Sequence, residues 1–149
     1  MGETLTLAVD SVVREHSDLH ARLGEWEEAL AGLENRNFQR SQAALQRLWR
    51  LVPFFEEEVP RHFRHEEGEF FGALQERYPD SAPLLRRFAG EHAEWTREWR
   101  DYRMELLYAD AVGETNRLYE LGTELVARLR RHMQDEELEL VVLARQQAG

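Results

Sequence analysis

The chain has no cysteine among its 149 residues. This absence excludes disulfide bonds, zinc sites built from thiolates and catalysis by a thiol. Long apolar runs are also missing, because no stretch approaches the roughly 20 apolar residues that a membrane-spanning helix needs. Residues 1–16 do not show the basic region followed by an apolar run that marks a signal peptide. We therefore expect a soluble protein of the cytoplasm that has no membrane partner.

Lysine is absent too, so all 19 basic residues are arginines, and the more numerous acidic residues give a formal net charge of −10. A surface with this sign of charge repels phosphate backbones, which argues against nucleic acid as a partner. The sequence also lacks a glycine-rich phosphate loop and any separate set of a nucleophile with an acid and a base. These absences favour a binding protein over an enzyme but leave the question open.

Patterns typical of strands are nearly absent, whereas residues that favour helix, such as Glu, Ala, Leu, Arg and Gln, are abundant. Helix-breaking residues gather in three places, 34–37, 78–83 and 109–113, and divide the chain into four long segments. Short connections between long helices favour antiparallel neighbours. The sequence therefore predicts one all-α domain over residues 1–149, an up-down-up-down antiparallel four-helix bundle.

Two prolines, Pro53 and Pro60, lie inside the second of these segments. Each removes one helical hydrogen bond. We expect kinks there, or a break followed by a short restart of the helix.

Each segment carries apolar residues at alternating three- and four-residue steps, which is the pattern of a bundle seam. Every seam also contains a histidine, and these are His16, His62, His92 and His132. A single histidine in a seam is more often a satisfied core residue than a ligand. Seam positions make up about two in seven, so chance would place roughly two of the six histidines there, and four are found.

Two glutamates, Glu66 and Glu136, share the seams with these histidines, and no seam arginine is available to pair with them. An unpaired buried charge costs several kcal/mol, and a bound metal ion would remove that cost. Counted from the helix ends at about 1.5 Å per residue, the four seam histidines fall within roughly one helical turn of the same depth. The spacing therefore predicts that they converge on one centre.

The residue types suit a pair of metal ions. His62 and Glu66 are four residues apart, as are His132 and Glu136, so each pair lies on one helical face. Imidazole nitrogens and carboxylate oxygens suit iron, manganese or zinc. A carboxylate has two oxygens, so two glutamates can bridge two ions roughly 3.5–4 Å apart and leave positions for water, hydroxide or dioxygen.

The two halves of the chain look like copies of one another. The Glu-His pair at 15–16 matches the Glu-His pair at 91–92, and the HFRHEEGEFF segment at 62–71 matches the HMQDEELELV segment at 132–141. In this alignment the two His-x-x-x-Glu motifs coincide. Two related helix pairs would form a natural cage for two ions.

These motifs, in this order, resemble the haemerythrin-like (HHE cation-binding) domain family over nearly the whole chain. The family pattern is a His in the first helix, His-x-x-x-Glu in the second, Glu-His in the third and His-x-x-x-Glu-Glu in the fourth. The resemblance implies a haemerythrin-like four-helix bundle with two iron ions, an oxo or hydroxo bridge and two bridging carboxylates, although other divalent metals would also suit the donors. Carried over position by position, it implies that the ligands are His16, His62, Glu66, His92, His132 and Glu136.

The sequence departs from the family pattern at one point. Oxygen-carrying haemerythrins have a second His in the third helix, four residues from the first, whereas the residues four away from His92 are Phe88 and Thr96. This difference argues against simple oxygen carriage.

Several polar residues lie close to the expected ligands without matching the motif. His65 is a candidate fifth imidazole, with water as the alternative, and Glu69 is a candidate ligand or an acceptor that orients a histidine. Glu67 and Glu137 lie further from the seams, so we expect them to be solvated. His20 lies at the edge of its seam and is expected at the surface or beside a ligand.

The resemblance implies a metal-binding role in dioxygen or iron binding, in sensing, or in handling oxidative or nitrosative stress. Metal ions are therefore the expected partners, with dioxygen or nitric oxide as further ligands, and no protein partner is evident. Two alternatives stay open: a di-iron oxidase of the same fold, and a metal-free helical interaction module. The ferritin-like oxidases are disfavoured because their Glu-x-x-His motif does not occur in the sequence.

Overall fold

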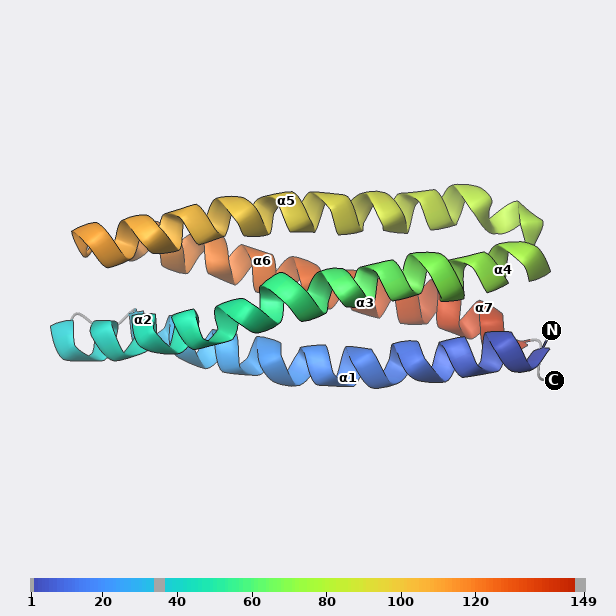
Figure 1. The fold of residues 1–149 in the computed structure, drawn as a ribbon, viewed down its shortest axis with the longest axis horizontal. Coiled ribbons are helices and arrows are strands. Elements are labelled where there is room, and N and C mark those ends of the chain that lie inside the picture. The colour runs from blue at the N-terminus through green and yellow to red at the C-terminus, as the bar shows by residue number, and fades with distance from the viewer. Residues whose placement is uncertain (1, 34–36, 147–149) are drawn as a thin grey trace.

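The computed structural model of the protein describes residues 2–33 and 37–146. In these residues the backbone is helical except at short connections, and four long helices pack together in alternating directions (Figure 1). The first long helix begins and the last one ends at the same end of the bundle (Figure 1). The prediction of an all-α, up-down-up-down four-helix bundle is confirmed.

The first long helix is a single element, α1 (Gly2–Leu33), and the third is α5 (Ala82–Val112), which follows the 3-10 turn η3 (Pro79–Ser81). The second and fourth are continuous helices in which α-helical pieces alternate with wider π-helical turns. The pieces of the second long helix are α2 (Phe38–Pro53), η1 (Phe54–Glu58), α3 (Val59–His65), η2 (Glu66–Phe70) and α4 (Phe71–Arg77). Those of the fourth are α6 (Asn116–Glu136), η4 (Glu137–Val141) and α7 (Val142–Arg145).

Two of the helix ends have identifiable local causes. The side chain of Asn37 accepts hydrogen bonds from the backbone N–H groups of Gln39 and Arg40, and so caps the start of α2. Gly113 has a φ of 82°, a left-handed conformation that glycine adopts without strain, and it ends α5. Most of the predicted break at 34–37 lies outside the described residues.

The predicted break at 109–113 is too long. Helix α5 continues up to the residue before Gly113, because Ala109 is a good helix former that packs in the core with an exposed fraction of 1%. The predicted break at 78–83 contains η3, and α5 begins within it. Pro83 lies in the first turn of α5, where the N–H that proline lacks would have no helical partner.

The two prolines of the second long helix do not break it. Pro53 is followed directly by the π-helical turn η1, and Pro60 lies in the first turn of α3. A π-helical turn pairs a carbonyl with the N–H five residues later instead of four, and such a turn lies between the two prolines. The expected disturbance therefore takes the form of a wider turn, and the helix neither stops nor restarts.

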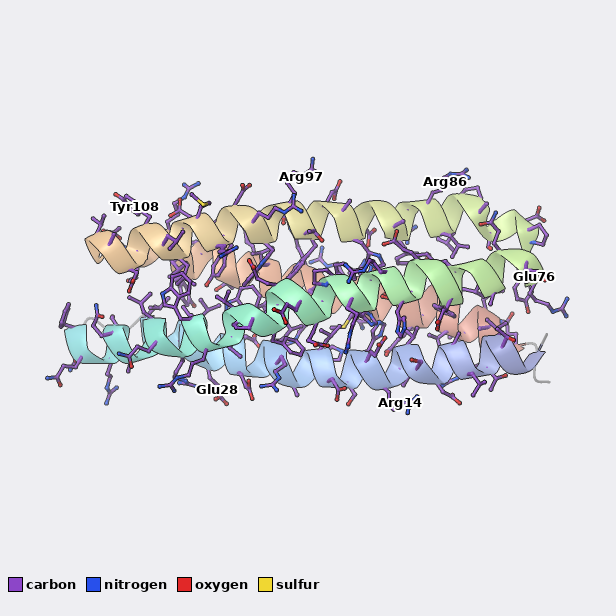
Figure 2. All side chains as sticks on the ribbon, in the orientation of Figure 1. Arg14, Glu28, Glu76, Arg86, Arg97 and Tyr108 are labelled. Carbon is purple, nitrogen blue, oxygen red and sulfur yellow. The ribbon has the colours of Figure 1, made fainter. Side chains whose placement is uncertain are left out.

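Charged side chains lie on the outside of the bundle, as Arg14, Glu28 and Arg97 illustrate (Figure 2). No helix in the described part of the chain combines the length and apolar character needed to cross a membrane.

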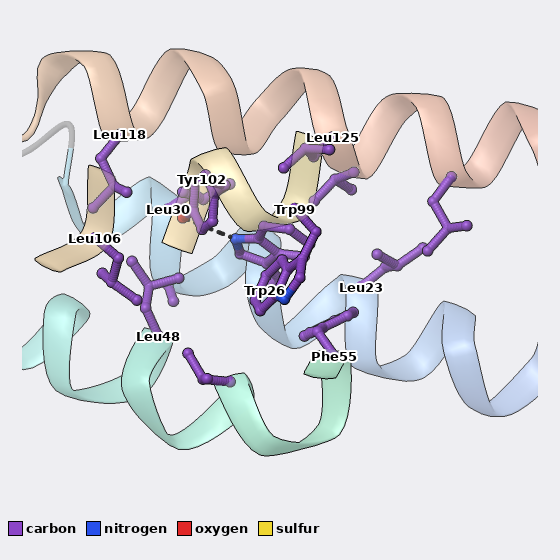
Figure 3. Packing of buried hydrophobic residues seen from close by; sticks show 14 of the residues in the cluster. Leu23, Trp26, Leu30, Leu48, Phe55, Trp99, Tyr102, Leu106, Leu118 and Leu125 are labelled. Atoms are coloured by element: carbon purple, nitrogen blue, oxygen red, sulfur yellow. Dashed lines mark hydrogen bonds between the residues drawn. The ribbon is translucent and has the colours of Figure 1, made fainter. Parts of the chain in front are cut away.

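The apolar interior forms two clusters, one toward each end of the bundle. The larger cluster surrounds Trp26 and includes Leu23, Phe55 and Leu125 (Figure 3). The smaller one lies toward the end where α1 begins, and Phe88 is among its members. On each long helix a stretch of sequence without members of either cluster separates the two, and the polar residues described next lie in these stretches or within two residues of them.

Candidate metal centre

Polar side chains are buried at one level of the bundle, between the two apolar clusters. Among the described residues, seven polar or charged side chains are buried. One is Ser81, and the other six are the ligands expected from the sequence: His16, His62, Glu66, His92, His132 and Glu136. Glu66 and Glu136 are both completely buried.

All four long helices contribute to this level. His16 comes from α1 and His92 from α5. His62 lies in α3, and the glutamate one turn later begins η2. His132 lies near the end of α6, and its glutamate is the last residue of that helix, directly before η4. Both glutamates therefore lie next to a π-helical turn, a distortion that is frequent at functional sites.

The six side chains form two groups of four that share both glutamates. One group contains His16 and His62, the other contains His92 and His132, and each includes Glu66 and Glu136. In each group, one candidate ligand atom per residue lies within 4.8 Å of the others. Two groups that share two carboxylates have the arrangement needed to hold two ions side by side.

The distances show that each carboxylate reaches both groups. Oε1 of Glu66 lies 2.6 Å from Nε2 of His62 and 3.5 Å from Nε2 of His92. Oε1 of Glu136 lies 3.2 Å from Nε2 of His16 and 3.2 Å from Nε2 of His132. The bridging role expected of the two glutamates is therefore compatible with their positions.

Although these atoms are close, none of them makes a hydrogen bond of regular geometry. The Nε2 atoms of all four histidines and both carboxylate oxygens of Glu66 and Glu136 are buried without a hydrogen-bond partner. A buried polar group without a partner costs about 1–3 kcal/mol, and a charged one costs more. Eight such atoms converging on one level, all of them nitrogen or oxygen donors, fit a metal site.

The other ring nitrogen of each histidine points outward to a glutamate. The contacts of Nδ1 are His16 with Glu137 at 3.2 Å, His62 with Glu15 at 2.7 Å, His92 with Glu67 at 2.9 Å and His132 with Glu91 at 2.7 Å. A carboxylate at Nδ1 favours the tautomer in which Nδ1 carries the proton and donates it, so that Nε2 keeps a free lone pair for a metal. It also holds the ring in one orientation.

None of these four contacts was predicted from the sequence, including those of Glu67 and Glu137. Glu67 and Glu137 were predicted to be solvated, but each accepts from a histidine on another helix while remaining about two-fifths exposed, at 42% and 41%. Each directly follows a ligand glutamate, and a one-residue step turns a side chain by about 100° around a helix. That turn points it toward a neighbouring helix, so the Glu-Glu dipeptide marks these two positions, although the sequence does not show which histidine each one contacts.

The contacts repeat the internal duplication of the sequence. Glu15 precedes the ligand of α1 and accepts from His62, and Glu91 precedes the ligand of α5 and accepts from His132. The Glu-His pairs at 15–16 and 91–92 thus have the same role in each half. Each of these two glutamates accepts a hydrogen bond from the histidine of the next long helix, and so links two neighbouring helices beside the site.

His65 and Glu69, the two further candidate ligands, are not brought into either group. His65 is half exposed, and its Nδ1 lies 3.3 Å from Oε1 of Glu15. Glu69 is 66% exposed, and its carboxylate lies 3.9 Å from Nε2 of His65. Both side chains lie on the flank of the second long helix, rotated away from the seam that carries Glu66. His20 is exposed, as expected.

Neither of the two positions four residues from His92 places a metal-ligating side chain beside it. Phe88 packs against the ring of His132, with 5.5 Å between ring centroids. The hydroxyl of Thr96 donates to the backbone carbonyl of His92 and is therefore used within its own helix. On the other side, Phe63 stacks on His92 with a centroid distance of 4.0 Å. His92 therefore has no second imidazole four residues away on α5, and an aromatic ring covers one face of its own ring.

The buried carboxylates govern the charge of the imidazoles in the metal-free protein. Burial by itself lowers the pKa of His16, but Glu136 and Glu66 outweigh it and raise the pKa to about 10. Burial likewise lowers the pKa of His62, and Glu15 and Glu66 raise it to about 9. The pKa of Glu136 lies well below its usual range, because its histidine neighbours outweigh the effect of burial.

Removing the charge of the outer glutamates is expected to weaken metal binding. Glu15→Gln and Glu91→Gln keep an acceptor for Nδ1 but remove the negative charge that makes the imidazole a better donor. Such changes typically lower metal affinity about 10–100-fold. Competition with a chelator at fixed pH measures the effect. Glu28→Gln, at a 75% exposed site of the same helix α1, is the control; equal affinities for all three variants would contradict the assigned role.

The fold and the site together define a class of protein, the four-helix bundles with two adjoining groups of buried histidine and glutamate donors suited to metal cations. A family model described as the Hemerythrin HHE cation binding domain matches residues 7–144. The chain belongs to this family, and the resemblance seen in the sequence is confirmed. Comparison with curated proteins and with solved structures gives no match.

Proposed function

We propose that the protein binds two iron ions, one in each group of donors, with Glu66 and Glu136 as bridging ligands. The observation that carries the proposal is the set of eight buried donor atoms without hydrogen-bond partners, divided into two groups that share both carboxylates. His16 and His62 would hold one ion, and His92 and His132 the other. Membership of a cation-binding family supports the same assignment.

The donor set narrows the choice of metal. Nitrogen and oxygen donors without thiolate suit iron, manganese or zinc. Iron supplies reversible one-electron chemistry and open coordination positions for dioxygen or nitric oxide. We therefore propose a role in dioxygen or iron binding, in sensing, or in handling oxidative or nitrosative stress.

The protein's own residues would hold and isolate the ions. The outer glutamates keep the imidazoles oriented with their Nε2 atoms inward, and the two apolar clusters exclude water above and below the site. A cavity of about 350 Å³ between α5 and α6 is lined by His132 and Trp95, among others. This cavity offers small molecules an approach to the ligand with the largest exposed fraction, 7%.

The same cavity favours a di-iron oxidase as the second candidate. Charged side chains of both signs line it, including Glu91, Arg131 and Asp135, so a small polar molecule could lie beside His132. Oxygen consumption separates the two functions. With excess reductant, an oxidase consumes oxygen over many turnovers, whereas a binding protein takes up oxygen only in proportion to its iron.

Metal content measured by elemental analysis, with an absorption spectrum recorded in air, tests the proposal directly. We expect about two irons per chain, as a pair of bridged sites requires, and near-ultraviolet bands of an oxo-bridged ferric pair. A protein that contains no metal, and that takes up none when ferrous iron is added without oxygen, would leave a helical interaction module as the remaining function.

A further inference from the structure

Aromatic rings follow one another from the candidate metal centre into the larger apolar cluster. Phe63 stacks on the ligand His92, with ring centroids 4.0 Å apart and ring planes 7° apart. Trp95, one turn further along α5, lies edge-on to Phe63 at 6.1 Å. Trp99, a further turn along, stacks on Trp95 at 6.0 Å with planes 6° apart. The series therefore runs without interruption over two turns of α5.

The series ends in a compact group of rings. Trp26 meets Trp99 edge-on at a centroid distance of 5.5 Å, and Tyr102 stacks on Trp99 at 5.8 Å. The indole N–H of Trp26 donates to the hydroxyl of Tyr102 at 3.2 Å (Figure 3). The rings from Trp95 onward have exposed fractions of 5% or less, so little of their surface meets solvent, although Trp95 also lines the cavity beside His132.

The indole N–H groups differ in what they donate to. Trp95 donates to the backbone carbonyl of Leu125 at 3.1 Å, and Trp26 donates to a phenol. Trp99 donates to the carboxylate of Glu56 at 3.2 Å. An indole that loses an electron becomes far more acidic at its N–H, to about the acidity of a carboxylic acid. A carboxylate accepts that proton far more readily than a backbone carbonyl or a phenol does. Of these three indoles, Trp99 is therefore the one whose oxidised form is best stabilised.

Glu56 also has a route to solvent for the proton. Its side chain is 29% exposed, and Oε1 lies 2.9 Å from the guanidinium of Arg103, which is about half exposed. Packing in the core accounts for the burial of the indole rings. It does not require that the indole furthest along α5 from the ligand His92 should face a carboxylate, nor that this carboxylate should reach the surface.

We propose that Trp95 and Trp99 form an electron relay that quenches the metal centre when a peroxide has oxidised it. This inference rests on the proposed iron site. Trp99 loses one electron, which passes through Trp95 to the oxidised centre and reduces it by one electron. The N–H proton of Trp99 moves to the carboxylate of Glu56, leaving a neutral indole radical. Oxidising equivalents are thereby moved away from the ligands. Without an external reductant the neutral radical gives a second electron to the centre, which balances the two electrons taken by the peroxide, and water adds to the doubly oxidised indole with loss of a proton to give an oxygenated indole.

The test maps oxygenated tryptophan in protein that has been loaded with ferrous iron, oxidised to the ferric state in air and then treated with stoichiometric hydrogen peroxide. We expect the modification to concentrate at Trp99, as measured by mass spectrometry of peptides. Trp49 is the internal reference, because it is more exposed and an oxidant in solution would attack it first. Zinc-loaded protein, whose metal accepts no electron, should lose the preference for Trp99.

Two variants separate a relay from simple packing. Trp95→Phe keeps a buried ring but removes the intermediate donor, and Glu56→Gln removes the proton acceptor at a partly exposed site. Both should lower the modification of Trp99 several-fold while iron content stays unchanged. Glu57→Gln, at the exposed neighbouring position, is the matched control and should behave as the wild type.

The outcomes distinguish the relay from the site on which it depends. If iron binds and its absorption bands respond to peroxide, but Trp99 is not modified preferentially or both variants leave it unchanged, the relay is overturned and the iron site stands. If the protein takes up no iron, the proposed function and the relay fail together. Equal modification of Trp99 in iron- and zinc-loaded protein also overturns the relay.

Discussion

The double substitution Glu66→Gln and Glu136→Gln is expected to abolish metal binding and leave the fold intact. Both carboxylates belong to both donor groups, so their loss removes two of the four donors from each group at once. Glutamine has nearly the same shape, and its neutral amide is a weak metal ligand. It can also hydrogen-bond to the buried Nε2 atoms, so no buried charge is left without a partner.

Thermal unfolding with and without metal measures this effect together with metal content. Consider a ligand that binds only the folded state. When its free concentration is about 1,000 times its dissociation constant, it stabilises that state by about 4 kcal/mol. The wild type should show a stabilisation of this order, and the double variant should show none. Glu69→Gln changes a 66% exposed glutamate of the same helix and should keep the full stabilisation. Metal binding by the double variant at wild-type affinity would exclude the bridging role.

The second large effect is a dependence of stability on pH that appears only in the metal-free protein. In that state the pKa of His16 is about 10 and that of His62 about 9, whereas an unfolded chain has a histidine pKa of about 6.5. Between these values the folded protein binds more protons than the unfolded chain does. The stability from these two groups is therefore complete below about pH 6.5 and is lost as the pH rises through about 9 to 10.

Unfolding of the metal-free protein at pH 6, 8 and 10 tests this expectation. We expect a loss on the order of several kcal/mol, since each pKa unit corresponds to about 1.4 kcal/mol. This pH range suits the test because the chain has no lysine. Apart from the histidines, its four tyrosines are the side chains that ordinarily titrate near the upper end of the range. Glu66→Gln with Glu136→Gln removes the charges that raise these pKa values and should flatten the profile. Equal stability of the wild type at pH 6 and 10 would contradict the assignment.

Metal-loaded protein should behave differently. A metal ligand must be a neutral imidazole, so binding at pH 7 has to displace the protons held by His16 and His62. Metal affinity should therefore rise with pH while the stability of the loaded protein stays nearly constant. The proton release can be measured by calorimetry in buffers with different heats of ionisation.

Most of the fold was predictable because helix formation depends on near neighbours. The seams follow from three- and four-residue steps, and Gly113 ends α5 through its own conformation. The error at 109–113 arose because alanine suits a helix and also tolerates a connection. At Pro53 and Pro60 the sequence predicted the loss of helical hydrogen bonds. It did not predict the π-helical turn, because the choice between a break and such a turn depends on packing.

The candidate site shows the same division between local and distant information. The two His-x-x-x-Glu motifs could be recognised because a four-residue step places both side chains on one helical face. Glu67 and Glu137 could not be assigned to their histidines, because their partners lie on other helices and only the rotation of each helix about its axis decides the contact. The same rotation leaves His65 on the flank of its helix, although its spacing along the chain made it a reasonable candidate.

The sequence by itself determined that four helices form, which residues line their seams, and that the four seam histidines lie at about the same depth, because these properties depend on periodicity and on rise per residue. The tertiary structure alone decided that the six donors form two groups with both carboxylates in common, that four further glutamates hold the imidazoles, and that Trp99 faces Glu56. Each of these contacts joins residues on different helices. Their existence depends on the rotation and offset with which the helices pack, which no single helix specifies.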